Sequence, residues 1–199
     1  MRLTGWIGIA ALLLSTAGRA EVQVGQPAPE FSGTDTQGRT HTLGEYRGQV
    51  VVLEWTNHDC PYVRKHYGTG NMQAQQREAT ARGVTWLSII SSAPGKQGYV
   101  TPAEAEALTD GRDAAPSAVI LDPGGEIGRL YRARTTPHMY IIDRDGTLAY
   151  MGGIDSIGSA DPADIPRATP YVRVALDEVL DGRSVTTPVS RPYGCSVKY

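Results

Sequence analysis

Apolar residues in this 199-residue chain alternate between the spacing of strands and the spacing of helices. Short runs that are largely apolar and β-branched are typical of strands buried on both faces of a sheet. Three such runs predict central strands at residues 50–53, 84–90 and 118–121. Two further runs, at residues 139–142 and 147–151, flank a turn signal and predict a hairpin.

Helical spacing of apolar residues appears between and after these runs. A long helix is expected over about residues 61–82, with Gly68 and Gly70 interrupting it and Gly83 ending it. Thr101 is expected to cap a shorter helix, because Pro102 and Glu104 follow it at the spacing of a capping box. Two more short helices are expected at residues 126–132 and 171–180.

Polar, turn-rich segments separate these elements. Residues 22–49 carry many Pro and Gly turn signals, and short strands on either side of residues 36–39 predict an N-terminal hairpin. Residues 54–59 and 161–170 are interpreted as polar loops. Residues 183–199 have no helical period and are expected to run over the surface as a tail.

This order of elements predicts one α/β domain. A mixed central sheet flanked by helices, with right-handed parallel crossovers, accommodates strand–helix–strand followed by helix, hairpin and helix. The predicted organisation is a domain over residues 21–182, opened by the hairpin extension, and a tail over residues 183–199 that carries Cys195.

The first twenty residues have the composition of a signal peptide. A positive charge at Arg2, an apolar run at residues 6–14 and small residues at Gly18 and Ala20 predict cleavage after Ala20. The run is shorter than the ~20 residues that span a bilayer, so we expect an exported, periplasmic or secreted protein that does not span the membrane once processed.

Cleavage would remove two positive charges and change the net charge from −2 to −4. This mild acidity argues against a nucleic-acid partner. The sequence has no phosphate-binding loop and no Gly-x-Ser-x-Gly motif, so phosphoryl transfer and serine hydrolysis have no basis in it.

The candidate chemistry centres on Cys60, which follows a predicted central strand and precedes a helix that begins with Pro61. Unpaired N–H groups at a helix start stabilise a thiolate. His58, Arg64, Lys65 and His66 add positive or titratable groups to this segment, while Asp59 opposes ionisation. We therefore expect a reactive thiol here rather than an inert one.

Cys195 is the second and last cysteine of the chain. In an oxidising compartment two cysteines can form a static disulfide or a working redox couple, and their spacing does not distinguish the two. The surrounding motif RPYGCSVKY, at residues 191–199, is too distinctive for a disordered end, and a disulfide to Cys60 would tie it down.

Several motifs resemble the redoxin, or alkyl hydroperoxide reductase/thiol-specific antioxidant, family of thioredoxin-fold proteins over about residues 22–182. The segment WTNHDCPYVRKHY at residues 55–67 is similar to a peroxiredoxin-like branch with a single Cys-Pro. The opening residues of the family pattern are Gly25, Ala28, Pro29, Phe31, Asp35, Gly38, Leu43 and Gly48.

The resemblance implies a thiol-based oxidoreductase with antioxidant activity. Its substrate would be a peroxide or a protein disulfide, and a thiol would donate electrons. Cys60 and Cys195 would be the catalytic residues, with Cys60 attacking and Cys195 resolving through a disulfide. Thr136 and Pro137 match the loop in which the family places a cis-proline beside the cysteine, where Thr136 could pair with an extended peptide or position a peroxide.

The remaining residues expected to shape this site are Trp55, as a wall of the cleft, together with Asn57, His58 and Arg64. The chain departs from the family at three positions. Val63 stands where a dithiol thioredoxin has its second cysteine, and Leu53 and Asn57 replace the Pro and the Thr or Ser of a peroxiredoxin.

A non-enzymatic binding protein with a structural Cys60–Cys195 disulfide is the alternative. Copper is one candidate ligand, since His58, His66, His138 and Met139 supply imidazole and sulfur, and a protein partner is another. No pair of these residues has a spacing that fixes a metal site, so neither a metal nor any other cofactor is expected.

Overall fold

The computed structural model describes residues 22–199, so the expected signal peptide and its cleavage after Ala20 lie outside the described residues. Seven strands form one sheet in the order β2-β1-β5-β4-β3-β7-β8, and β6 and β9 form a separate pair. The strands of the main sheet are β1 (Ser32–Asp35), β2 (Thr40–Thr42), β3 (Val51–Trp55), β4 (Thr85–Ile90), β5 (Ala118–Leu121), β7 (His138–Ile142) and β8 (Leu148–Gly152).

The sheet is mixed, as the sequence predicts. Strand β4 runs parallel to both β3 and β5, whereas β7 is antiparallel to β3 and to β8. The N-terminal hairpin β1–β2 joins this sheet through antiparallel pairing of β1 with β5, so it extends the sheet rather than standing apart from it.

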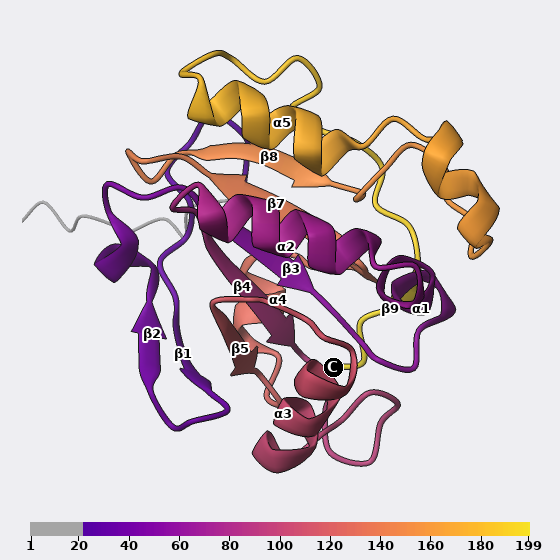
Figure 1. Ribbon diagram of the computed structural model, residues 1–199. Helices are drawn as coiled ribbons and strands as arrows, with labels where there is room; N and C mark the ends of the chain where they lie inside the picture. The colour runs from indigo at the N-terminus through magenta and orange to yellow at the C-terminus, as the bar shows by residue number, and fades with distance from the viewer. Residues whose placement is uncertain (1–21) are drawn as a thin grey trace, which may run out of the picture.

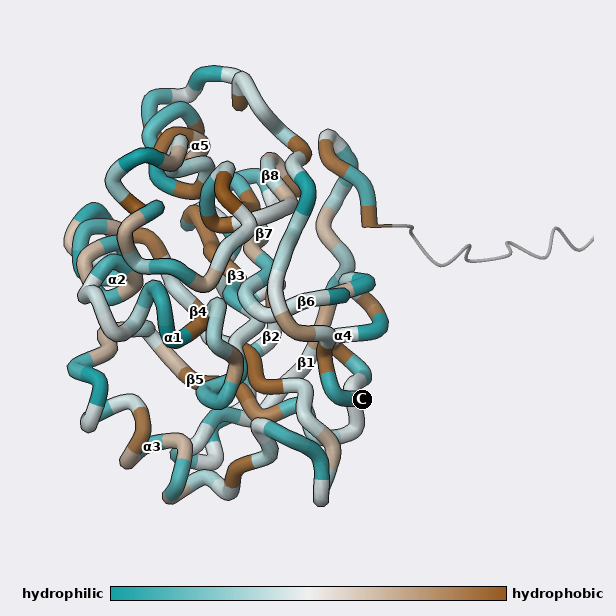
Figure 2. The backbone as a smooth tube through the Cα atoms, turned by 90° about the vertical axis from the view of Figure 1, so that its right-hand side faces the viewer, coloured by the Kyte–Doolittle hydropathy of each residue, from teal (hydrophilic) through white to brown (hydrophobic). Residues whose placement is uncertain are grey.

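Helices cover the two faces of the sheet unequally (Figures 1 and 2). On one face, α1, α2 and α5 pack against the side chains that β3, β4 and β7 direct to that face. Helix α3 packs next to this core through Ala105. The opposite face is covered by α4 and the N-terminal segment. The bounds of the helices are α1 (Pro61–Gly68), α2 (Asn71–Ala81), α3 (Pro102–Gly111), α4 (Glu126–Leu130) and α5 (Tyr171–Leu180).

Local sequence signals account for the helix boundaries. Gly70 has φ of 75° and separates α1 from α2, which confirms the predicted interruption. Thr101 accepts a hydrogen bond from the Glu104 N–H, and the Glu104 carboxylate accepts one from the Thr101 N–H, which confirms the predicted capping box. Both signals are local in the sequence, and tertiary packing did not override them.

Two predicted loops are wrong. Strand β3 continues through Glu54 and Trp55, both 0% exposed, because the Glu54 carboxylate accepts hydrogen bonds from Tyr67 and Trp86 inside the core. The loop over residues 161–170 contains the 3₁₀-helix η2 (Pro162–Arg167), which Asp161 caps through the Ala163 N–H. A second 3₁₀-helix, η1 (Leu43–Tyr46), follows β2.

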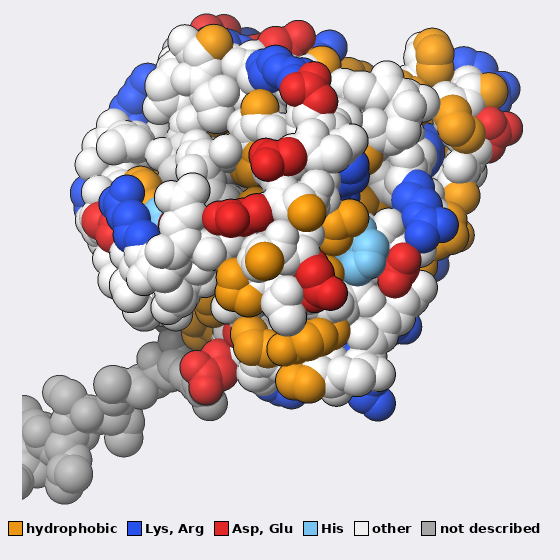
Figure 3. Space-filling view, turned by 60° about the horizontal axis from the view of Figure 1, so that its bottom comes forward, with side chains coloured by type: hydrophobic (Ala, Val, Ile, Leu, Met, Phe, Trp, Pro, Cys, Tyr) orange, Lys and Arg blue, Asp and Glu red, His pale blue; other side chains and the backbone are white. Residues whose placement is uncertain are grey.

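No helix among residues 22–199 is long and apolar enough to cross a membrane. On the face turned forward in Figure 3, acidic and basic side chains are interspersed rather than gathered into a field of one sign.

Candidate functional site

Cys60 is the N-cap residue of α1, at the point where the chain leaves β3. Its backbone N–H donates to the Asn57 carbonyl at 3.0 Å, and its carbonyl accepts from the Arg64 N–H at 2.9 Å. Pro61 occupies the first helical position, where an N–H would have no partner inside the helix. The residue is 0% exposed and joins the core beneath α1.

The C-terminal segment lies directly over this thiol. Strand β9 (Cys195–Ser196) pairs antiparallel with β6 (Thr135–Thr136), so that Cys195 faces Thr136. The Cys195 N–H donates to the Cys60 Sγ at 3.4 Å, and that sulfur donates to the Thr136 carbonyl at 3.0 Å. Both cysteines are free thiols, and the Thr136–Pro137 peptide bond is cis.

Gly194 allows the tail to come this close to the loop. Its φ is 132°, in the range that favours glycine, and an added Cβ would overlap the Thr136 carbonyl. The approach of the two backbones therefore depends on the absence of a side chain at position 194.

Tyr193 is held by a buried polar cluster. Its hydroxyl donates to the Asp155 carboxylate at 2.5 Å and lies 3.2 Å from the His66 Nε2, while the Lys65 Nζ lies 3.7 Å from the same carboxylate. Lys65, His66 and Asp155 are 2%, 0% and 5% exposed. We call these three residues and Tyr193 the anchor cluster.

Further contacts hold the tail on both sides of the cysteine. Upstream, the Gly153 N–H donates to the Ser190 hydroxyl at 2.9 Å. Downstream, the Ala93 N–H donates to the Lys198 carbonyl at 2.8 Å, and the Tyr199 hydroxyl donates to a backbone carbonyl at 2.8 Å. Residues 188–199 therefore form a strap that is fixed at both ends, and we refer to them as the C-terminal strap. The segment runs over the surface, as the sequence predicts, and its last residues lie over Cys60.

The two thiols differ in acidity. Burial is the largest single influence on Cys60 and opposes its ionisation, but hydrogen bonds from the Cys195 thiol, the Val63 and Cys195 N–H groups and Thr136 hold the pKa of Cys60 below its usual value. Burial, together with the hydrogen bond and the charge of Cys60, raises the pKa of Cys195 to about 11. The first proton therefore leaves Cys60.

The polar residues expected around Cys60 face elsewhere. The Asn57 side chain, 2% exposed, donates to the Gln97 carbonyl and accepts from the Asp59 N–H. Arg64 forms an ion pair with Asp59 at 3.0 Å and donates to the His58 carbonyl. The His58 Nε2 lies 3.5 Å from the Asp59 carboxylate, so the side chains of Asn57, His58 and Arg64 all contact groups of the loop that carries Cys60.

Trp55 does not line the cleft, contrary to expectation. It is 0% exposed, packs against Tyr131 and Tyr140 on the sheet face opposite Cys60, and donates to the Ser91 hydroxyl. Successive residues of a strand point to opposite faces of the sheet, and Trp55, the last residue of β3, points to the face that does not carry Cys60.

The candidate copper ligands do not converge. His66 belongs to the anchor cluster, whereas His138 lies on the other side of the sheet, where its ring centroid is 4.5 Å from that of Tyr140 and the two rings are tilted by 42°. Within residues 22–199, no three His, Cys, Asp or Glu side chains are grouped as a metal-binding set.

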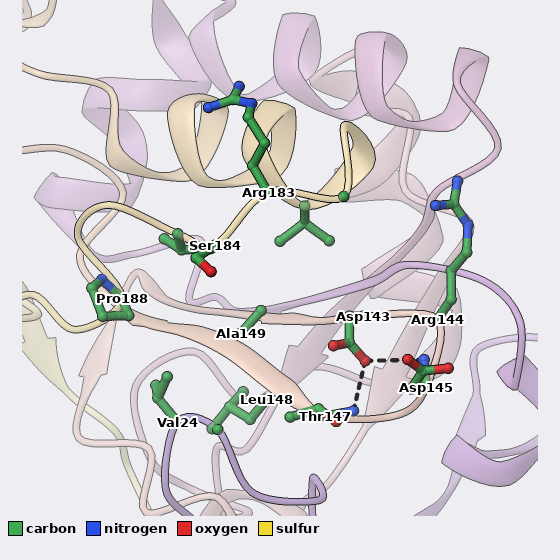
Figure 4. Close-up of a pocket in the computed structure, with 14 residues that line it drawn as sticks. Val24, Asp143, Arg144, Asp145, Thr147, Leu148, Ala149, Arg183, Ser184 and Pro188 are labelled. Atoms are coloured by element: carbon green, nitrogen blue, oxygen red, sulfur yellow. Dashed lines mark hydrogen bonds between the residues drawn. The ribbon is translucent and has the colours of Figure 1, made fainter.

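A cavity of about 680 Å³ lies away from the thiols (Figure 4). The β7–β8 turn, the end of α5 and Pro188 line it, and the Asp143 carboxylate there accepts hydrogen bonds from the N–H groups of Asp145 and Thr147. The Asp143 carboxylate is thus bonded within the turn, and the cavity lies apart from the cysteine site.

A mixed sheet, a cysteine at the helix start after a central strand and a facing cis-proline loop together define a thioredoxin-like fold. Within that class, the chain belongs to the AhpC/TSA family, whose model matches residues 24–151.

Three proteins show what this chain is similar to in sequence and in fold. Thiol-disulfide oxidoreductase ResA of Geobacillus kaustophilus is 25% identical over 137 residues, which cover 65% of this chain and 69% of that protein. An uncharacterised conserved protein from Geobacillus kaustophilus has a solved structure that is similar over 89% of this chain and 93% of its own, with 25% identity and a TM-score of 0.76. A putative thiol:disulfide interchange protein DsbE from Chlorobium tepidum shares the fold, with a TM-score of 0.57, 21% identity and coverage of 80% and 99%.

Sequence reasoning missed the anchor cluster. Asp155 carried no signal, because it lies in a loop 38 residues away from Tyr193 along the chain. Tyr193 and Gly194 stand in the motif around Cys195, whose distinctive composition was the only indication that the tail has a fixed position.

Proposed function

We propose that this protein is a thiol-disulfide oxidoreductase whose redox unit is the pair Cys60 and Cys195. Two electrons move as the pair converts between dithiol and disulfide, while a protein dithiol or disulfide undergoes the opposite change. The observation that carries the proposal is the Cys195 N–H at 3.4 Å from the Cys60 sulfur, which brings the second thiol to the first through the pairing of β9 with β6.

The acidity of the two thiols supports the same role. The thiolate is the nucleophile in thiol–disulfide exchange, and a low pKa also makes a sulfur a good leaving group. Cys60 has the lowered pKa and Cys195 the raised one, so Cys60 is the member of the pair that carries negative charge in the dithiol state. The relatives named thiol-disulfide oxidoreductases add to this support.

Peroxide reduction is a second candidate, favoured by the burial of Cys60. A thiol that is 0% exposed under a fixed strap is accessible to a small oxidant more readily than to a protein. The Cys60 thiolate would attack one peroxide oxygen, breaking the O–O bond and releasing water or an alcohol, and form a sulfenic acid. The Cys195 thiol would then attack the sulfenic sulfur, forming the disulfide and releasing water. Asn57 carries an amide in place of the hydroxyl that family members use at this position, and this amide is engaged with the Gln97 carbonyl and the Asp59 N–H.

We also propose that the protein is exported from the cytoplasm. A pair of thiols positioned to form a disulfide suits an oxidising compartment, in keeping with the signal-peptide composition of residues 1–20. Sequencing the N-terminus of the protein recovered from outside the cytoplasm checks this. A chain that keeps Arg2 and stays in the cytoplasm would contradict it.

The function is tested by following the oxidation of a protein dithiol by the oxidised chain, and the loss of thiols on adding hydrogen peroxide to the reduced chain. We expect C60S and C195S to lose exchange activity, and V174A, at an exposed position of α5, to keep it. Full activity in C195S would contradict the proposed couple. Rapid peroxide consumption together with slow protein exchange would select the second candidate.

A further inference from the structure

The two sulfurs of the proposed couple are not equally open to a partner. Cys60 is 0% exposed beneath α1 and the C-terminal strap, whereas Cys195 is partly exposed on the strap itself. The strap is fixed by the anchor cluster on one side of Cys195 and by Lys198 and Tyr199 on the other. A macromolecular partner therefore meets Cys195 as a partly exposed residue of the strap, whereas it reaches Cys60 only by displacing the strap.

A groove lies beside the strap and is lined by the strap residues that precede Cys195. Its volume is about 510 Å³, and Thr135 of β6, Tyr171 and residues 191–194 of the strap are among its lining. Gly194, the last of these strap residues, is bonded directly to Cys195. An extended peptide with a thiol could lie in this groove beside β6.

Positive charge flanks Cys195 along the strap. Arg191, which is exposed, lies on the groove side, and Lys198 acts on Cys195 from the other side, where it favours a negative charge on that sulfur. Cations beside a reaction site raise the local concentration of an anionic reactant. The reactant favoured at Cys195 is therefore a thiolate.

Resting on the proposed function, we propose that protein dithiols react with the oxidised chain at Cys195, so that the mixed disulfide with the partner is carried by Cys195 and not by Cys60. The partner's thiolate attacks the Cys195 Sγ, the bond between the Cys195 and Cys60 sulfurs breaks, and Cys60 leaves as a thiolate. The partner's second thiol then attacks its own sulfur in the mixed disulfide, and its proton passes to the departing Cys195. The partner ends as a disulfide and the chain as a dithiol, so two electrons are transferred.

The acidity of the pair fits this direction of attack. Exchange is faster when the departing thiol has the lower pKa. Against the effect of burial, the Val63 and Cys195 N–H groups lower the pKa of Cys60, and both remain when the Cys195 sulfur is bonded to a partner, whereas burial raises the pKa of Cys195. Attack on the Cys60 sulfur would instead require the poorer leaving group, Cys195, to depart. Access and leaving-group ability thus favour the same sulfur.

The test uses the full-length protein oxidised to the Cys60–Cys195 disulfide, with glutathione as a monothiol probe that forms a mixed disulfide and cannot complete the second step within one molecule. The reaction is quenched with acid at early times, the free thiols are alkylated, and tryptic peptides are identified by mass. Trypsin separates the cysteines, since Cys60 lies in a peptide that ends at Arg64 and Cys195 in one that ends at Lys198.

We expect glutathione on Cys195 and the alkyl group on Cys60 in at least tenfold excess over the reverse pattern. The variant Y193F, which loosens the strap, should raise the share of glutathione on Cys60, and the control Y99F, which removes an exposed tyrosine hydroxyl outside the strap, should leave the wild-type pattern unchanged. Glutathione mainly on Cys60, or equally on both cysteines, would overturn the inference while leaving the couple intact. Failure to form any Cys60–Cys195 disulfide would refute the proposed function itself, and the inference with it.

Discussion

At the scale of single residues, the site consists of two thiols whose acidities are set by each other. The Cys195 thiol and N–H both favour the Cys60 thiolate, and the resulting charge disfavours ionisation of Cys195. Burial raises the pKa of both thiols, the Val63 N–H at the helix start lowers that of Cys60, and the contact between the two thiols lowers the pKa of Cys60 and raises that of Cys195.

Removing the Cys195 thiol should therefore raise the pKa of Cys60. A hydrogen bond to a charged group contributes about 1.5–3 kcal/mol, so we expect a rise of about one pKa unit or more in C195A. C195S keeps a hydroxyl donor at the same place and should show a smaller rise. Titration of the thiolate by ultraviolet absorbance measures both, and an unchanged pKa in C195A would contradict this origin of the acidity.

The histidine of the anchor cluster predicts a dependence of stability on pH. Burial and the nearby Lys65 lower the pKa of His66 to about 4, although Asp155 opposes them, whereas the unfolded chain has the ordinary value of 6.5. Between pH 6.5 and 4 the unfolded state binds the extra proton. The free energy of unfolding is therefore expected to fall as the pH falls through this window, by up to about 1.4 kcal/mol per pH unit.

Denaturant unfolding of the wild type and of H66N at pH 7, 6 and 5 checks this dependence. Buried His138, whose pKa is lowered to about 3, contributes a slope of the same sign in both proteins. H66N should lose the part of the slope that His66 supplies. Equal slopes in the two proteins would show that His66 is not the group responsible.

At the scale of elements, the strap positions Cys195 as a strand. Because β9 pairs with only two residues of β6, its position depends on contacts outside the ladder, and the anchor cluster provides those nearest to the cysteine. A short edge pairing of this kind is weak by itself.

Y193F should accordingly reduce the equilibrium constant for forming the Cys60–Cys195 disulfide from glutathione. Loss of the hydrogen bond to the Asp155 carboxylate predicts a decrease of about tenfold or more. Y99F removes an exposed tyrosine hydroxyl and serves as the matched control. If Y193F and Y99F gave equal constants, Tyr193 would not position Cys195.

The elements that the sequence predicted correctly are those with strong local patterns. The periodic spacing of apolar residues, together with Gly and Pro signals, predicted the central strands, the interrupted helix before Gly83 and the β7–β8 hairpin. Cys60 and the cis-proline loop were accessible through the family motif. The path of the strap was not predictable, because its partners Asp155, Ala93 and Gly153 are distant in sequence and carry no pattern of their own.

At the scale of the whole molecule, the pair connects the end of the chain to its first helix. The two cysteines are 135 residues apart, and closing so long a loop removes much entropy from the unfolded chain. The loop-entropy estimate sets an upper value of about 5 kcal/mol for the gain in stability.

The oxidised wild type should therefore melt roughly 10 °C or more above the reduced wild type if most of that gain is realised. C195S has no disulfide to form, so its Tm should not differ between oxidising and reducing buffers. Calorimetry of the four samples measures the effect. Equal Tm values for oxidised and reduced wild type would argue against a disulfide across the molecule.

The central claim is that Cys60 and Cys195 form a working couple and not a permanent bridge. Its most direct test is equilibration of the protein in glutathione buffers of graded potential, followed by acid quenching and peptide mapping of the disulfide. We expect one intramolecular Cys60–Cys195 disulfide that forms and breaks reversibly as a two-electron couple. Its midpoint reduction potential should lie above roughly −300 mV. A bridge that stays closed well below that potential, or a Cys60 that remains unpaired in oxidising buffer, would contradict it.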